Sequence, residues 1–164
     1  RQRQMCIRDS VKELLMKSRA MVMAGCLVAM VAAAITAADV KLDDVKCIMN
    51  PKAAAKAATG VEYKEGKAFF CCNNCASKFK ADKEKFATKA NHQLVATGQY
   101  TQTKCPFSGG KLNANQSVKV GGVNVQFCCG NCKGKAAGAK GDAQAEMVFG
   151  DKAFAKGFAV AKDK

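Results

Sequence analysis

The chain has 164 residues and ten cysteines, and eight of these cysteines fall into two groups of four. Each group has three clustered cysteines directly after a phenylalanine. A lone cysteine lies 24 positions before the first trio and 23 positions before the second. The groups are Cys47, Cys71, Cys72 and Cys75, and Cys105, Cys128, Cys129 and Cys132. Because Phe, Cys, Asn and Lys recur at the same offsets in both trios, the sequence predicts two copies of one small module.

The interval between the lone cysteine and each trio predicts a β-hairpin. In the second copy, apolar residues alternate on both sides of Gly121-Gly122, a two-residue loop typical of tight hairpins. The first copy has a similar layout around Glu65-Gly66. A module of about 50–60 residues has a small core and needs additional cross-links, which the cysteines can provide.

The residues after each trio predict helices. Residues 76–89 contain no Gly or Pro and place Phe79 and Phe86 one heptad apart, which predicts one helix. Three glycines predict a weaker helix in the second copy. Asp142 and Asp151 are expected to cap two further helices, the last containing Phe154 and Phe158. The predicted fold class is α+β: two modules, each a hairpin followed by a helix and held together by a cysteine quartet.

The beginning of the chain predicts an exported protein. Met16 is followed by a short basic segment and an uncharged run that ends in small residues, so residues 16–38 are interpreted as a cleaved signal peptide. Residues 1–15 are interpreted as a non-native, adapter-derived extension. The mature chain is expected to be periplasmic or secreted, with no membrane span after cleavage. It divides into a first four-cysteine module (39–92), a connector (93–103) and a second four-cysteine module with C-terminal helices (104–164).

The cysteine spacing permits metal binding, disulfides or thiol–disulfide exchange. Cys72-x-x-Cys75 and Cys129-x-x-Cys132 have the spacing with which two thiolates in a tight turn bind one ion. Because neighbouring residues of a strand face opposite sides, this geometry favours Cys72 and Cys129 as ligands over Cys71 and Cys128.

An even number of cysteines in an exported chain also fits a disulfide-stabilised interaction module, and C-x-x-C at a helix start fits a redox protein. Metal binding is favoured, chiefly because of the zinc-type spacing of the cysteines, and adjacent cysteines cannot readily bond to each other. Thiolate sites select Zn²⁺, Cu⁺ or an iron–sulfur cluster. Zn²⁺ is favoured for a closed four-sulfur site and Cu⁺ where only two or three thiolates bind, and about one ion per module is expected.

The pattern resembles the TRASH and YHS families of small treble-clef-like metal-binding domains. The likeness covers about residues 46–89 and 104–140 and is closer in the second copy, with Cys105-Pro106-Phe107-Ser108-Gly109 and Phe127-Cys128-Cys129. The family spacing, a cysteine followed by a long gap and C-x3-C, maps to Cys47, Cys71 and Cys75 and to Cys105, Cys128 and Cys132. It therefore implies the opposite choice within each adjacent pair. The resemblance implies buffering, delivery or sensing of a metal, with another metal-handling protein of the envelope as a partner.

Charge and composition argue against two other classes of protein. Residues 39–164 contain 21 lysines, no arginine and 11 acidic residues, a formal charge of +10. The lysines are dispersed and arginine is the preferred residue for bidentate phosphate contacts, so no nucleic-acid partner is expected.

The only histidine, His92, belongs to neither quartet and is expected to pack or cap. General acid–base catalysis then has few candidate groups, and the chain is not expected to be an enzyme.

Overall fold

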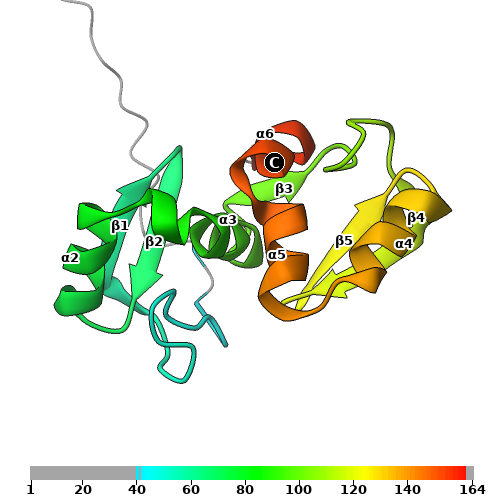
Figure 1. Cartoon of the computed structure of the whole chain (residues 1–164). Coiled ribbons are helices and arrows are strands. Elements are labelled where there is room, and N and C mark those ends of the chain that lie inside the picture. The colour runs from blue at the N-terminus through cyan, green and yellow to red at the C-terminus, as the bar shows by residue number, and fades with distance from the viewer. Residues whose placement is uncertain (1–39, 41, 162–164) are drawn as a thin grey trace, which may run out of the picture. The chain divides into compact units, whose positions relative to one another are not determined.

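The computed structural model describes residue 40 and residues 42–161, and these residues adopt an α+β fold, as the sequence predicts (Figure 1). The predicted signal peptide and the extension before it, with Cys6 and Cys26, lie outside the described residues. Within the described part of the chain, no helix is both long and apolar enough to span a bilayer.

Two hairpin-and-helix units follow each other along the chain. The first unit contains β1 (Lys56–Tyr63), β2 (Gly66–Phe70) and α2 (Asn73–Ala81), and the second contains β4 (Asn113–Val120), β5 (Val123–Phe127) and α4 (Gly130–Gly138). Every bound in the second unit lies 57 residues after its counterpart in the first. The antiparallel register is also the same, with Tyr63 opposite Gly66 and Val120 opposite Val123. The structure thus repeats residue for residue across both units.

The repeat continues beyond these elements. The first unit goes on to a 3-10 turn (Glu84–Phe86), α3 (Ala87–Ala96) and β3 (Tyr100–Gln102), and the second to α5 (Gly141–Phe149), α6 (Asp151–Gly157) and β6 (Phe158–Val160). Strands β3 and β6 pair antiparallel. The last strand of each unit therefore joins the two units, and residues 93–103, expected as a connector, contain the end of α3 and all of β3.

Several local predictions differ from the structure. Asp142 and Asp151 are not N-caps: they lie in the first turns of α5 and α6, whose N-cap residues are Lys140 and Gly150. The helix expected over 76–89 is broken, because the Asp82 carboxylate accepts the backbone N–H of Lys85 and the chain turns there. The loop of the first hairpin is Lys64-Glu65, since Gly66 already pairs with Tyr63. Phe158 is not helical: α6 ends at Gly157, and Phe158 pairs with Gln102 as the first residue of β6.

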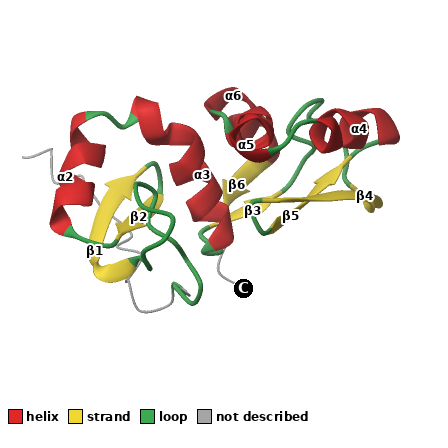
Figure 2. Ribbon diagram, turned by 60° about the horizontal axis from the view of Figure 1, so that its bottom comes forward, coloured by secondary structure: helices red, strands yellow, loops and turns green. Residues whose placement is uncertain are grey.

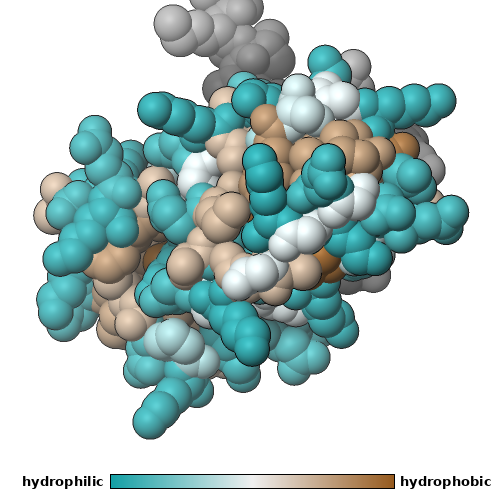
Figure 3. All heavy atoms as spheres, turned by 45° about the vertical axis from the view of Figure 1, so that its right-hand side comes forward, coloured by the Kyte–Doolittle hydropathy of each residue, from teal (hydrophilic) through white to brown (hydrophobic). Residues whose placement is uncertain are grey.

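The hydrophobic core is continuous through both units and includes the lone cysteines. In the first unit Phe79 of α2 packs against Tyr63 and Phe70 of the hairpin, with ring centroids 5.4 and 5.1 Å apart. Between the units, α3 contacts α5 and α6 (Figure 2). Asn91 of α3 is buried there and donates to the Phe149 carbonyl at 2.8 Å. The outer surface drawn in Figure 3 is mainly hydrophilic, with smaller apolar areas between the polar residues.

Candidate metal centres

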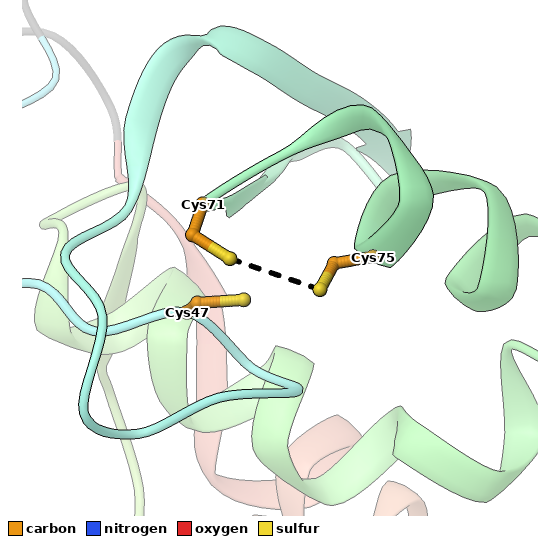
Figure 4. A group of neighbouring side chains, drawn as sticks. All are labelled: Cys47, Cys71 and Cys75. Atoms are coloured by element: carbon orange, nitrogen blue, oxygen red, sulfur yellow. Dashed lines mark hydrogen bonds between the residues drawn. The ribbon is translucent and has the colours of Figure 1, made fainter.

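Three cysteine sulfurs meet in each unit. Cys47, Cys71 and Cys75 form the first triad, and Cys105, Cys128 and Cys132 form the second; in both, the three sulfurs lie within 4.8 Å of one another. Figure 4 shows the sulfurs of the first triad pointing toward one another from three different segments. Cys47 comes from the loop before β1, Cys71 directly follows β2, and Cys75 lies in the first turn of α2. The second triad has the same layout around β5 and α4.

In each triad, the distance between the sulfur that follows the strand and the sulfur in the helix matches that of two thiolates sharing one ion. Cys71 Sγ lies 3.7 Å from Cys75 Sγ, and Cys128 Sγ lies 3.7 Å from Cys132 Sγ. With a zinc–sulfur bond of about 2.3 Å, two ligands of a tetrahedral site are about 3.8 Å apart. Both triads can therefore hold one ion with little rearrangement of their sulfurs.

Cys72 and Cys129 lie outside the triads, contrary to the expectation from strand alternation. Each is the exposed N-cap residue of the following helix, in extended conformation, with φ/ψ of −158°/164° for Cys72 and −155°/168° for Cys129. The alternation argument was wrong because β2 is buried on both faces, between α2 and α3. Cys71 consequently also faces the interior, and the chain turns outward only at Cys72.

Cys72 and Cys129 nevertheless remain close to the triads. The Cys72 sulfur is 3.8 Å from that of Cys71, and the Cys129 sulfur is 3.6 Å from that of Cys128. The structure therefore brings all eight cysteines predicted as ligands to two places. Six of them form the triads, and the other two, Cys72 and Cys129, are exposed to solvent.

Glutamine side chains hold the first site in place. Gln93 of α3 is buried and pairs with the edge of β2, accepting the Phe69 N–H at 2.6 Å and donating to the Phe69 carbonyl at 2.9 Å. The same amide lies 3.0 Å from the carbonyl of Lys46, so it ties the loop of Cys47 to the strand that precedes Cys71. Gln99 binds Lys67 in the same two-bond manner. No sequence pattern marked these glutamines, because an amide that completes a strand edge requires no particular spacing.

The second site is held by equivalent contacts from other residues. Gln102 of β3 accepts the Gln126 N–H at 2.8 Å and donates to its carbonyl at 2.7 Å. The carbonyl of Gly157, at the end of α6, accepts the N–H groups of Thr103 and Lys104 at 2.9 and 3.1 Å. The C-terminal helix therefore positions the segment that leads into Cys105.

The ionisation of the triad cysteines is uneven. Burial opposes ionisation of Cys47, but hydrogen bonds from the backbone of Cys71, Asn50 and Met49 outweigh it and lower the pKa of Cys47. Burial, followed by the side chains of Cys72 and Cys71, raises the pKa of Cys75 to about 12. Without a metal ion, Cys47 therefore ionises more readily than Cys75, whose sulfur stays protonated at neutral pH. A bound cation would allow all three to ionise, because it offsets their mutual repulsion.

The second triad differs from the first by a hydroxyl group. The Ser108 Oγ lies 3.2 Å from Cys128 Sγ and accepts the Gly110 N–H at 3.1 Å. Burial opposes ionisation of Cys105, but the Ser108 side chain and nearby backbone groups lower its pKa to about 6. At Cys132, burial followed by Cys128 and Cys129 raises the pKa to about 12. The corresponding residue of the first loop is Asn50, whose Oδ1 accepts the Lys52 N–H instead.

The exposed cysteines ionise more readily than their partners in the same turn. The backbone N–H of Cys75 lowers the pKa of Cys72, and that of Cys132 lowers the pKa of Cys129. Both sulfurs lie at the positive end of a helix, which also favours a thiolate.

The eight cysteines of the described residues are all free, and the sulfur separations of 3.6–3.8 Å given above are far from the S–S bond length of about 2.05 Å. His92 packs as expected: its Nε2 is 3.0 Å from the Gly121 carbonyl oxygen, and its ring meets Phe149 edge-on. Met49, considered as a sulfur ligand after Cys47, is partly buried against the core. Comparison with known proteins found no match: no family model, curated protein or solved structure is significantly similar to this chain.

Proposed function

We propose that the chain is an exported metal-binding protein that holds one ion in each unit, through Cys47, Cys71 and Cys75 and through Cys105, Cys128 and Cys132. The observation that carries this proposal is the meeting of three sulfurs within 4.8 Å in both units. Duplication of the same geometry is difficult to attribute to packing alone, since four of the six sulfurs come from partly exposed residues. Metal binding would also explain how such small units remain folded, because binding free energy adds to folding free energy.

The donor set narrows the choice of ion. Thiolates prefer soft or borderline ions, so Mg²⁺ and Ca²⁺ are poor candidates. Zn²⁺ fits a tetrahedral site that takes the three sulfurs and one further ligand, and Cu⁺ fits the three sulfurs alone. We propose Zn²⁺ as the natural ion, with Cu⁺ as the alternative.

We further propose that each unit is treble-clef-like and related to the TRASH and YHS domains. Support comes from the order of elements, a loop cysteine, a hairpin and a cysteine in the first turn of a helix. The C-x3-C spacing of those families picks out Cys71 and Cys75, the residues that meet in the triad. A role in binding, buffering or delivering metal, without catalysis, follows from this likeness.

The test uses a protein of residues 39–164 that is loaded with Zn²⁺ or Cu⁺ under reducing conditions. It compares variants in which one of two neighbouring cysteines is replaced. Native mass spectrometry should find two ions per chain. Cys71→Ser and Cys128→Ser should each lose one ion, and the double variant should lose both. Cys72→Ser is the matched control. It replaces a sulfur by an oxygen one residue away from Cys71, and this variant should retain two ions. Wild-type protein that binds neither ion, or that cycles between thiol and disulfide without metal, would refute the proposal.

A further inference from the structure

We propose that Cys72 and Cys129 pass the metal ion between each triad and the thiolates of a partner protein. This inference rests on the proposed function and assigns a distinct task to the two cysteines outside the triads. It makes each unit a site of exchange as well as storage. The partner is a protein that presents solvent-accessible cysteine thiolates of its own.

The first argument is distance. The Cys72 and Cys129 sulfurs lie 3.8 and 3.6 Å from the nearest triad sulfur, as close as two ligands of one ion. Neither belongs to the group of sulfurs within 4.8 Å of one another. Each can therefore reach an ion in the triad by a small side-chain movement, without being one of the three sulfurs that hold it.

The second argument is access. Cys47 and Cys105 are 2% and 0% exposed, so a partner cannot reach the ion from their side. Cys71, Cys75, Cys128 and Cys132 are only partly exposed. Cys72 and Cys129 are the exposed members of the two groups, and an incoming thiolate meets them first.

The third argument is repetition. Both cysteines are helix N-caps with backbone angles that agree within 4°. Other cap-adjacent positions differ between the units, for example Asn73 against Gly130. The residues preferred at an N-cap are Ser, Thr, Asp and Asn, and cysteine is not among them. Helix capping alone therefore does not account for a cysteine at both positions.

The exchange is a series of ligand substitutions in which the ion keeps its charge. A bond from the ion to the Cys72 sulfur forms as one triad bond breaks. Partner thiolates then bind one after another, and with each new bond a remaining triad sulfur or Cys72 leaves, until only the partner holds the ion. Each partner thiol that binds gives up a proton, and each module sulfur released takes one up. No oxidant or reductant is needed, because sulfur stays at the thiol level throughout.

The experiment follows transfer of Zn²⁺ between two copies of the chain. Unlabelled, Zn²⁺-loaded donor is mixed with metal-free, ¹⁵N-labelled wild-type acceptor, and native mass spectrometry follows the ion over time. The donors are wild type, the variant Cys72→Ser/Cys129→Ser, and Asn74→Ser as a control for an exposed change in the same turn. The acceptor provides thiolates of defined chemistry.

For wild type and the Asn74→Ser control, the transfer rate should rise with acceptor concentration. The double cysteine variant should bind two ions with an affinity within about twofold of wild type, but transfer them about tenfold or more slowly, because it lacks the neighbouring thiolate. Equal transfer rates would overturn the inference. Loss of ions from the double variant at equilibrium would also overturn it, since Cys72 and Cys129 would then be permanent ligands. Only wild-type protein that binds no ion would refute the proposed function itself.

Discussion

Replacing Ser108 with alanine should weaken the second metal site and leave the first unchanged. The Ser108 oxygen already accepts the Gly110 N–H, and a metal-bound thiolate carries no hydrogen. The hydroxyl must therefore donate its own hydrogen to the Cys128 sulfur, 3.2 Å away. In the proposed metal-bound state, with three thiolates around one cation, this bond would stabilise the negative charge of the sulfurs.

The size of the effect follows from the kind of bond that is lost. A hydrogen bond to a charged group contributes about 1.5–3 kcal/mol. Ser108 is exposed, so water competes for the sulfur and the lower end of that range applies. About 1.5 kcal/mol corresponds to about a tenfold higher Kd. This agrees with the loss of about 10–100-fold seen when residues that hydrogen-bond to metal ligands are replaced.

The two sites can be measured one at a time. The variant Cys71→Ser should leave only the second site loaded, and competition with a chelator of known affinity then gives its Kd for Zn²⁺ with and without Ser108→Ala. The matched control is Asn50→Ala in a Cys128→Ser background. Asn50 occupies the corresponding loop position but hydrogen-bonds to the Lys52 backbone. An unchanged Kd for Ser108→Ala, or equal losses in both backgrounds, would refute the reasoning.

Two further predictions concern contacts outside the sites. Lys64 lies 2.7 Å from Asp151 and, with Asn91, lowers the pKa of that carboxyl below its usual 3.8. Because the pKa of Asp151 is lower in the folded than in the unfolded chain, ionised Asp151 stabilises the folded chain above about pH 4. This stabilisation is lost as the pH falls through the pKa of Asp151 in the folded chain. In urea unfolding of the metal-free chain, Lys64→Met should therefore lose more stability relative to wild type at pH 7 than at pH values that protonate Asp151; a difference that does not shrink as the pH falls would contradict this. Gly157→Ala should destabilise the chain by about 1–3 kcal/mol, since a Cβ there would lie 2.8 Å from the Pro106 backbone. Gly134→Ala in α4, with no atom within 4 Å, is its control and should stabilise by up to about 1 kcal/mol in the same assay; equal effects would show that the close approach is unimportant.

Local patterns predicted the hairpins and the helix that follows each trio. Gly121-Gly122 and the alternation around it indicated β4 and β5, and the recurrence of the trio indicated the duplication. These features depend on neighbouring residues, so they can be read from the sequence directly. The prediction that two groups of cysteines could hold metal ions depends on spacing and is likewise supported by the structure.

The identity of the triads depended on tertiary packing. Strand alternation assumes that one face of β2 is exposed, whereas α3 returns to cover the second face. That return is held by the hydrogen bonds of Gln93 and Gln99 to β2, and these polar side chains gave no hydrophobic signal. The choice between Cys71 and Cys72 therefore could not be made from local geometry. The break at Asp82 was missed for a related reason: a side chain competing for one backbone N–H outweighed good helix propensity.

The pairing of β3 with β6 has a consequence for how the duplication stabilises the protein. A single unit ending at Gln102 would leave the edge of β3 without a partner, and an open edge readily takes up a strand from another molecule. A separate unit closes such an edge by pairing with another molecule, and the stability of that pair depends on protein concentration. With both units in one chain, β6 closes the edge internally. The same strand contact then forms at any dilution of the protein.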